Sequence, residues 1–108
     1  MKIEISSKNM ELLPSLVEYV NEKLGSLDRH VQKYEQKGEL TLRVRIGRIT
    51  AHHQKGEVFE ASAYLDLPGP NIHVEKTSED MHTAIDMARA ALAQEIEKHK
   101  EKRGDKRS

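Results

Sequence analysis

The fold is decided by residues 39–49, which are ELTLRVRIGRI. Apolar residues occupy every second position from Leu40 to Ile46, and polar or charged residues lie between them. Successive side chains of a β-strand point to opposite faces of a sheet, so this period of two predicts a strand with one apolar face. Residues 57–67 repeat the alternation after a turn expected at residues 52–56, and they predict a second strand of the same kind.

Two shorter segments extend the predicted sheet. Residues 2–6 alternate in the same way, with Ile3 and Ile5 on one side. The turn signal Pro-Gly-Pro-Asn at residues 68–71 precedes residues 72–75, which predict a fourth strand. Each of the four strands then has one apolar face to bury.

A helix is expected between the first two strands. Leucine and valine recur at three- and four-residue spacing from Leu13 to Leu27, which predicts a helix with one apolar stripe. Gly25 should weaken or bend its last part. A polar linker is expected after this helix, and it ends at Gly38.

The last predicted element is a long helix with an apolar stripe over residues 81–96. Thr77 or Ser78 can cap its start. Glu79 and Asp80 would lie in its first turn, where the helix dipole favours negative charge.

The predicted order is β-α-β-β-β-α, an α+β fold in which a four-stranded sheet carries two helices packed on one face. Residues 1–103 are expected to form this single domain, and residues 104–108 a short basic tail without order. The face away from the helices would carry the polar residues of the strands, namely Arg43, Arg45, Glu60, Tyr64, His73 and Glu75.

The composition limits the possible classes of function. The 108 residues include 18 Lys or Arg, 18 Asp or Glu and no Cys, so the formal net charge is zero. Without cysteine, a disulfide framework, a cysteine-based zinc cluster and a thiol nucleophile are excluded. The start of the sequence has no apolar run typical of a signal peptide, and no stretch approaches the roughly 20 apolar residues of a membrane span. A cytoplasmic protein is therefore expected.

The zero net charge hides two basic blocks. Residues 29–48 hold six basic and two acidic residues, and residues 98–108 hold the same numbers. Acidic residues are in excess elsewhere. Segregated charge of this kind indicates a polyanionic partner.

Motifs for catalysis and metal binding are missing from the sequence. The glycines are too scattered for a dinucleotide-binding loop, and the Gly-x-Ser-x-Gly of a hydrolase does not occur. His52 and His53 are adjacent and His82 lies one helical turn before Asp86, but a zinc site needs three or four converging ligands. We therefore expect a protein that is not an enzyme and that uses no metal or other cofactor.

The basic residues allow a plain interpretation beside the functional one. The cations of residues 98–103 can be a solvated helix end that complements its own dipole, or they can extend past the sheet and meet phosphates. Arg43 and Arg45 can be paired with glutamates of neighbouring strands, or they can grip RNA from an exposed face. Tyr64 is the one aromatic residue placed to stack on a base.

Two motifs near the end of the chain carry a resemblance. Residues 80–86 are DMHTAID, and residues 98–102 are KHKEK. They resemble the ribosome hibernation-promoting factor family, which usually has Asp-Met-Tyr-Ala-Ala-Ile-Asp and then a basic helix that ends in Lys-His-Lys-x-Lys. The resemblance extends over about residues 1–103. The chain resembles the short type, which has no C-terminal dimerisation domain.

The resemblance implies a fold similar to double-stranded-RNA-binding domains and a role in translation. Members of the family lodge in the decoding channel of the small ribosomal subunit, where they contact ribosomal RNA and exclude transfer and messenger RNA in stationary phase or stress. The expected partners are the small subunit and its RNA, with no DNA or membrane, and the chain would be a monomer away from the ribosome. The residues expected to bind RNA are Lys23, Arg29, Arg43, Arg45, Arg89, Lys98, His99, Lys100, Lys102 and Arg103.

Three positions depart from the family pattern. His82 takes the place of the usual Tyr. Ala91 and Gln94 stand where relatives usually carry Lys and Arg, and the loss of these two cations would weaken the phosphate contacts. Two other functions remain open. One is a double-stranded-RNA-binding module with no ribosomal role, and the other is a protein–protein adaptor that uses a sheet edge or a charged face.

Overall fold

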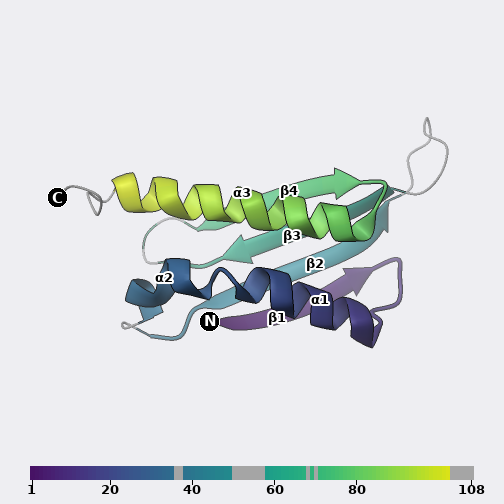
Figure 1. Ribbon diagram of the computed structural model, residues 1–108, viewed down its shortest axis with the longest axis horizontal. Helices are drawn as coiled ribbons and strands as arrows, with labels where there is room; N and C mark the ends of the chain where they lie inside the picture. Colours follow the sequence, from purple (N-terminus) through teal and green to yellow (C-terminus); the bar gives the residue numbers. More distant parts are fainter. Residues whose placement is uncertain (36–37, 50–57, 68, 70, 103–108) are drawn as a thin grey trace.

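A computed structural model describes residues 1–35, 38–49, 58–67, 69 and 71–102, and of the last two residues only the backbone (Figure 1). Its elements are, in chain order, β1 (Lys2–Lys8), α1 (Pro14–Gly25), α2 (Asp28–Glu35), β2 (Thr41–Ile49), β3 (Val58–Leu65), β4 (Ile72–Ser78) and α3 (Met81–Lys102). The predicted α+β fold is therefore confirmed, with one more helix than expected.

The four strands form one mixed sheet in the order β1-β2-β3-β4. β1 runs parallel to β2, and the other two pairs are antiparallel. Parallel strands cannot be joined by a tight hairpin, and here α1 and α2 provide the crossover between β1 and β2. The four strands expected from alternation are confirmed, and β4 extends three residues beyond its predicted end at Glu75.

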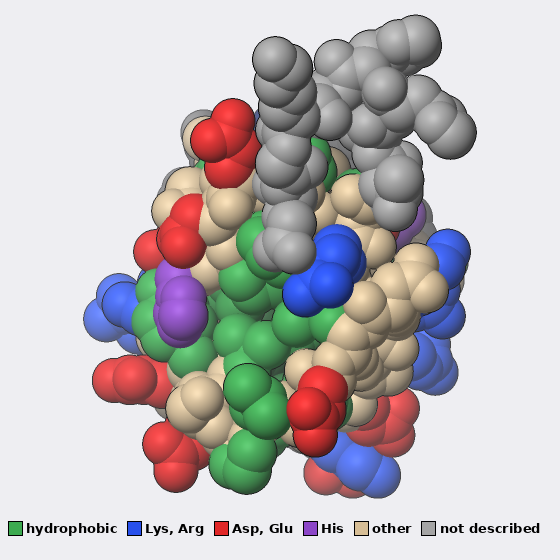
Figure 2. Space-filling view, turned by 90° about the vertical axis from the view of Figure 1, so that its right-hand side faces the viewer, with side chains coloured by type: hydrophobic (Ala, Val, Ile, Leu, Met, Phe, Trp, Pro, Cys, Tyr) green, Lys and Arg blue, Asp and Glu red, His purple; other side chains and the backbone are tan. Residues whose placement is uncertain are grey.

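All three helices cover one face of the sheet and leave the other face open (Figure 1). Viewed from the end where α1 and α3 begin, apolar side chains gather at the centre and charged side chains surround them (Figure 2). Each buried Leu or Ile stabilises the fold by roughly 1.5–3 kcal/mol relative to an exposed one. The largest fully buried side chains come from every layer: Val20, Leu24, Leu27, Val31, Leu42, Ile46, Leu65, Ile85, Leu92 and Ile96.

The prediction of a polar linker after the first helix is wrong. The chain does bend after Gly25, as expected, but Asp28–Glu35 then forms the helix α2. Val31 and Tyr34 are its buried residues, three positions apart, so one narrow face packs on the core while the rest stays polar.

The predicted start of the last helix also needs correction. Asp80 lies just before α3, and its carboxylate accepts hydrogen bonds from the backbone N–H and the hydroxyl of Thr83 at 2.9 and 2.8 Å. These bonds lower the pKa of Asp80. Asp80 is therefore the N-cap, and Ser78 instead accepts a hydrogen bond from the N–H of Asp80 at 3.2 Å.

Some predictions lie outside the described residues, among them the turn at 52–56 and the tail at 104–108. The similarity to double-stranded-RNA-binding domains stays a prediction, as does the domain boundary at residue 103. Within the described ranges, no helix combines the length and the apolar character needed to cross a membrane.

Candidate nucleic-acid interface

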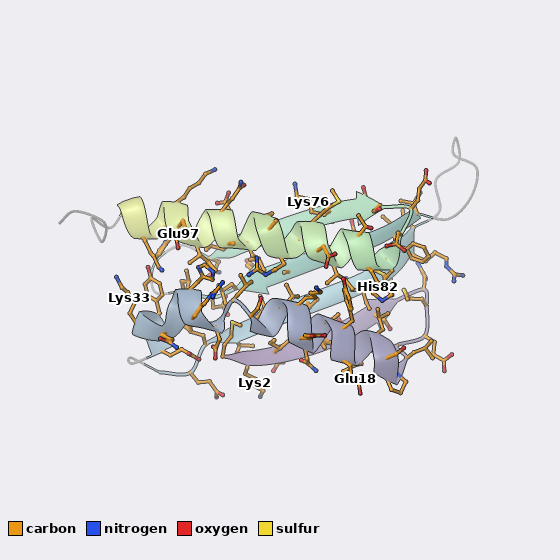
Figure 3. The ribbon with its side chains drawn as sticks, in the orientation of Figure 1. Lys2, Glu18, Lys33, Lys76, His82 and Glu97 are labelled. Carbon is orange, nitrogen blue, oxygen red and sulfur yellow. The ribbon has the colours of Figure 1, made fainter. Side chains whose placement is uncertain are left out.

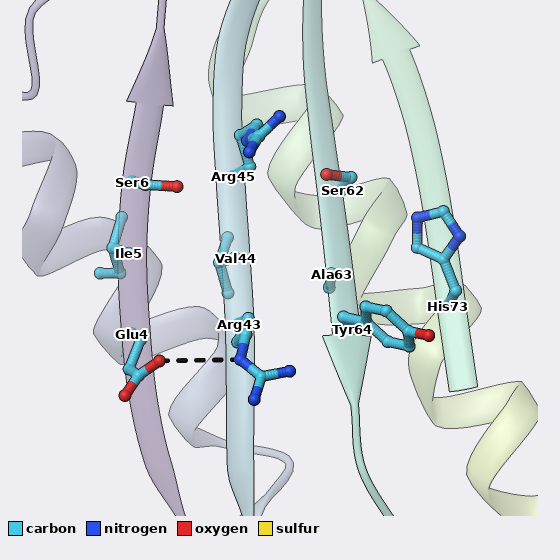
Figure 4. Close-up of a pocket in the computed structure, with 10 residues that line it drawn as sticks. All are labelled: Glu4, Ile5, Ser6, Arg43, Val44, Arg45, Ser62, Ala63, Tyr64 and His73. Carbon is cyan, nitrogen blue, oxygen red and sulfur yellow. Dashed lines mark ion pairs between the residues drawn. The ribbon is translucent and has the colours of Figure 1, made fainter. Parts of the chain in front are cut away.

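The strand register aligns the outward-facing residues of the open sheet face into rows across the four strands. The first row is Glu4, Arg43, Tyr64 and His73, and the second is Ser6, Arg45, Ser62 and Glu75. Arg43 and Arg45 thus point to the same side, as the sequence predicted (Figure 4). They lie in a hollow of about 390 Å³ that all four strands line.

The two arginines of this face differ in their surroundings. Arg43 pairs with carboxylates on both sides, at 3.8 Å from Glu4 and 3.4 Å from Asp66. Arg45 has the small hydroxyl side chains of Ser6 and Ser62 as its direct neighbours on the adjoining strands. Arg45 therefore has the more accessible charge of the two.

A pair of glutamates adjoins the hollow. A hydrogen bond with Glu75 raises the pKa of Glu60 above its ordinary value, and burial acts in the same direction. The positive charges of Lys8 and Arg45 act in the opposite direction. The proximity of the two carboxylates thus favours the protonated form of Glu60.

A second basic group lies on the helix side, at the junction of α1 and α2. The hydroxyl of Ser26 donates a hydrogen bond to the carbonyl of Lys23 at 2.6 Å and accepts one from Nε of Arg89 at 2.9 Å. Arg29 is exposed in the first turn of α2. The ammonium of Lys23 lies 5.4 Å from the ring centre of Tyr19. Ser26 thus ties a residue of α3 to the bend between the first two helices.

The third basic group is the end of α3. Lys98 is 66% exposed and lies 3.4 Å from Glu95, and Lys100 lies 3.4 Å from Glu97. The exposed ion pair of Lys98 contributes only about 0–1 kcal/mol, so a phosphate can displace Glu95 there, whereas the side chain of Lys100 is only 22% exposed. Lys102 is the last residue of the helix, and Arg103 lies outside the described residues.

The prediction that His99 contributes a donor or a stacking ring to RNA does not fit its placement. Its side chain is only 6% exposed, and its ring meets that of Tyr34 edge-on with the ring centres 5.6 Å apart. Nε2 is buried without a hydrogen-bond partner among the residues that the structure describes. His99 therefore belongs to the contact between α2 and α3.

The candidate residues accordingly form three groups on two faces. Arg43 and Arg45 lie on the open sheet face, and the other described candidates lie on or between the helices. Sequence reasoning missed Ser26, because nothing in the sequence indicates that it reaches α3. Its place directly after the helix-weakening Gly25 was the one available signal of a junction.

The three positions that depart from the pattern of the resembled family all lie on α3. His82 lies at the start of α3 beside α1 (Figure 3), with its ring edge-on to Tyr19 at 4.2 Å between centres. The Tyr19 hydroxyl donates a hydrogen bond to Asp86 at 2.7 Å, which raises the pKa of Tyr19 to about 12. Gln94 is exposed and Ala91 half-buried.

Among the described residues, no three His, Asp or Glu side chains gather as a metal site would require. His52 and His53 lie outside this part of the chain. The groups that the open sheet face brings together are arginines, carboxylates, hydroxyls and two aromatic rings. The cations, hydroxyls and rings among them suit the binding of phosphates and bases.

Comparisons with known proteins agree with one another. Residues 3–104 match the family described as Sigma 54 modulation protein / S30EA ribosomal protein. A ribosome hibernation promotion factor from Deinococcus radiodurans is 34% identical over 90% of this chain, which spans about half (48%) of that relative. A ribosome hibernation promoting factor from Pseudomonas putida is 32% identical over 94% of this chain and 89% of its own length.

Solved structures share the fold. The N-terminal domain of Thermus thermophilus Protein Y has a TM-score of 0.72 and 30% identity, covering 92% of this chain and 99% of its own. A ribosomal subunit interface protein from Coxiella burnetii has a TM-score of 0.74 at 21% identity, covering 93% of this chain and 98% of its own. At that identity the second likeness supports the fold alone.

Proposed function

Because the chain belongs to the Sigma 54 modulation protein / S30EA ribosomal protein family, we propose that it is a ribosome hibernation factor. In this proposal it binds small-subunit ribosomal RNA in the decoding and tRNA channel. It inhibits translation under stress or in stationary phase because it occludes transfer and messenger RNA. It acts as a cytoplasmic monomer by binding alone, without catalysis.

The observation that carries the proposal is the family match over residues 3–104, with relatives named ribosome hibernation factors. The placement of the basic groups supports it. Cations on both faces suit a protein enclosed by RNA on more than one side, whereas a duplex-binding module needs one basic face. The molecule measures 50 × 28 × 18 Å, a slender body that a channel can admit.

The end of α3 is the strongest phosphate-binding candidate. A helix of 22 residues is about 33 Å long, and its last turns carry Lys98, Lys100 and Lys102. Arg43 and Arg45 would bind from the sheet, with Lys23, Arg29, Arg89 and Arg103 as further contacts. Phosphate contacts of this kind fix position and add affinity in proportion to their number.

Sedimentation through a sucrose gradient tests the proposal. We expect the wild-type chain to migrate with small subunits and whole ribosomes, and to reduce tRNA binding to the small subunit. The triple variant Lys98→Ala, Lys100→Ala, Lys102→Ala should lose both effects. Lys76→Ala, compared with Lys98→Ala, is the control, since it removes one cation from β4 at a position that the proposal does not assign to RNA, and it should keep both effects.

Two other outcomes would overturn the proposal. Equal affinity for any RNA duplex, without preference for ribosomes, would indicate a general double-stranded-RNA-binding module. If the chain binds neither RNA nor ribosomes, the protein–protein adaptor remains as the alternative function. Footprinting of ribosomal RNA with and without the chain locates the contact, and protection outside the decoding channel would contradict the occlusion mechanism.

A further inference from the structure

The open sheet face pairs two exposed rings with an accessible cation. Tyr64 is 41% exposed, and His73 is exposed directly opposite it on β4. Their ring centres lie 5.4 Å apart and their planes are tilted by 41°, so the two rings are not stacked in parallel. An aromatic face left open on a sheet can stack on a nucleic-acid base.

Arg45 lies one row away from these rings. Diagonal neighbours on adjacent strands are about 7–8 Å apart, which places Tyr64 and Arg45 on opposite sides of the same hollow. Ser62 lies directly opposite Arg45 on β3, two residues before Tyr64, and it is small, so it leaves the hollow open (Figure 4). A base on the rings would thus have its phosphate within reach of the guanidinium.

The charge of this face selects the kind of nucleic acid. Among the described strand residues and Asp66, four basic side chains on this face, Lys2, Lys8, Arg43 and Arg45, are balanced by four acidic ones, Glu4, Glu60, Asp66 and Glu75. A neutral face gives little attraction for a duplex, whose phosphates are dense and whose bases are stacked away. It can accept a single nucleotide whose base is free to stack.

We propose that the hollow on the open sheet face binds one unpaired nucleotide, with its base on Tyr64 and His73 and its phosphate beside Arg45. This inference rests on the proposed function and names the RNA element that the sheet would contact, a looped-out or terminal nucleotide of ribosomal RNA. Arg43 is held at the edge of the hollow by its ion pairs with Glu4 and Asp66. The hydroxyls of Ser6 and Ser62 can donate hydrogen bonds to the ribose or phosphate.

A labelled five-nucleotide single-stranded RNA tests the site directly. NMR should show shifts of the Tyr64 and His73 ring signals during titration, and fluorescence anisotropy should give the affinity. Tyr64→Ala should weaken binding about tenfold, the usual scale for loss of one base–aromatic stack. Tyr64→Phe should keep the affinity, and Arg45→Ala should lessen the salt dependence by about one phosphate contact.

Met87→Ala is the matched control, because Met87 is also about 40% exposed but lies on α3. Unfolding midpoints in urea establish that each variant is folded. The inference is overturned if Tyr64→Ala binds like the wild type, if a duplex of the same strand binds this face equally, or if only helix signals shift.

Co-sedimentation of the wild type with ribosomes distinguishes this inference from the proposed function. If ribosomes bind while the ring signals do not shift during the RNA titration, only the sheet-face site fails. If the RNA binds at the rings while ribosomes do not, only the hibernation function fails.

Discussion

His99 lies between Lys98 and Lys100, and yet its ring is covered while Lys98 is largely exposed. Neighbouring positions on a helix face different directions, and residues three or four apart share a face. His99 follows the buried Ile96 by three positions and so continues the apolar stripe of α3. The sequence therefore contained the signal that places it in the core, although its basic neighbours favoured an RNA contact.

We expect His99→Leu to leave the free energy of unfolding unchanged or to raise it by up to about 1 kcal/mol, because it removes a buried nitrogen without a described partner. Urea unfolding measures this change, and ribosome co-sedimentation should be unaffected. Lys98→Leu, at the exposed neighbouring position, should instead weaken ribosome co-sedimentation and should not raise the free energy of unfolding. A large loss of stability would reveal a partner for Nε2, and a loss of ribosome binding would restore the RNA role.

At the scale of elements, the alternation of apolar and polar residues was enough to predict the four strands, because each strand has one buried and one open face. The helix α2 was missed because Val31 and Tyr34 are its only buried residues in an otherwise polar segment. The row that joins Arg43, Tyr64 and His73 could not be predicted either. It depends on the register between strands, and alternation within a strand does not specify that register.

The contact between β1 and β2 is tight at Gly47. A Cβ at this position would lie 2.9 Å from the backbone oxygen of Lys8, which cannot move aside easily. We expect Gly47→Ala to lower the free energy of unfolding by about 1–3 kcal/mol in urea. Gly25→Ala is the control. Its Cβ would meet nothing within 4 Å, so a gain of about 0.4–1 kcal/mol is expected. Equal effects of the two substitutions would contradict this account.

The hydrogen bond from Tyr19 to Asp86 links α1 to α3 and should be visible in a pH titration. The hydrogen bond to Asp86 and the negative charge of that carboxylate favour the protonated phenol, so the pKa of Tyr19 is about 12 in the folded chain against 10 for a free side chain. The stability that this bond contributes is present below pH 10 and is lost as the pH rises from about 10 to about 12.

NMR of the Tyr19 ring measures the titration. Asp86→Asn should lower the pKa of Tyr19 towards its ordinary value, since the carboxylate is the main cause of the shift. Glu22→Gln removes a charge that acts more weakly on the same ring, and it should change the pKa much less. A titration near 10 in the wild type would show that the link between α1 and α3 is not formed.

For the whole molecule, a net charge of zero conceals cations that lie on two faces and at one helix end. With about five phosphate contacts, the logarithm of the ribosome-binding constant should fall with the logarithm of salt concentration at a slope of about −3.5 to −4.5. The slope is a better measure than affinity, because it counts the contacts made by the three groups together.

Gln94→Arg should strengthen ribosome binding and steepen that slope by about 0.7–0.9, because Gln94 is exposed on α3 one helical turn before Lys98. Binding measured at several salt concentrations gives the slope. Ser15→Arg adds the same charge at an exposed position where α1 begins, away from the end of α3 (Figure 1), and should leave the slope unchanged. An equal gain from both variants would mean that net charge matters rather than position.

The strand order β1-β2-β3-β4 also has a consequence for how the chain folds. β2, β3 and β4 follow one another and pair with their neighbours, so short loops bring them together at low entropic cost. β1 is separated from β2 by the whole crossover through α1 and α2, and it must close a longer loop before it gains any hydrogen bond. We therefore expect the three-stranded meander to form first and the N-terminal strand to join it last.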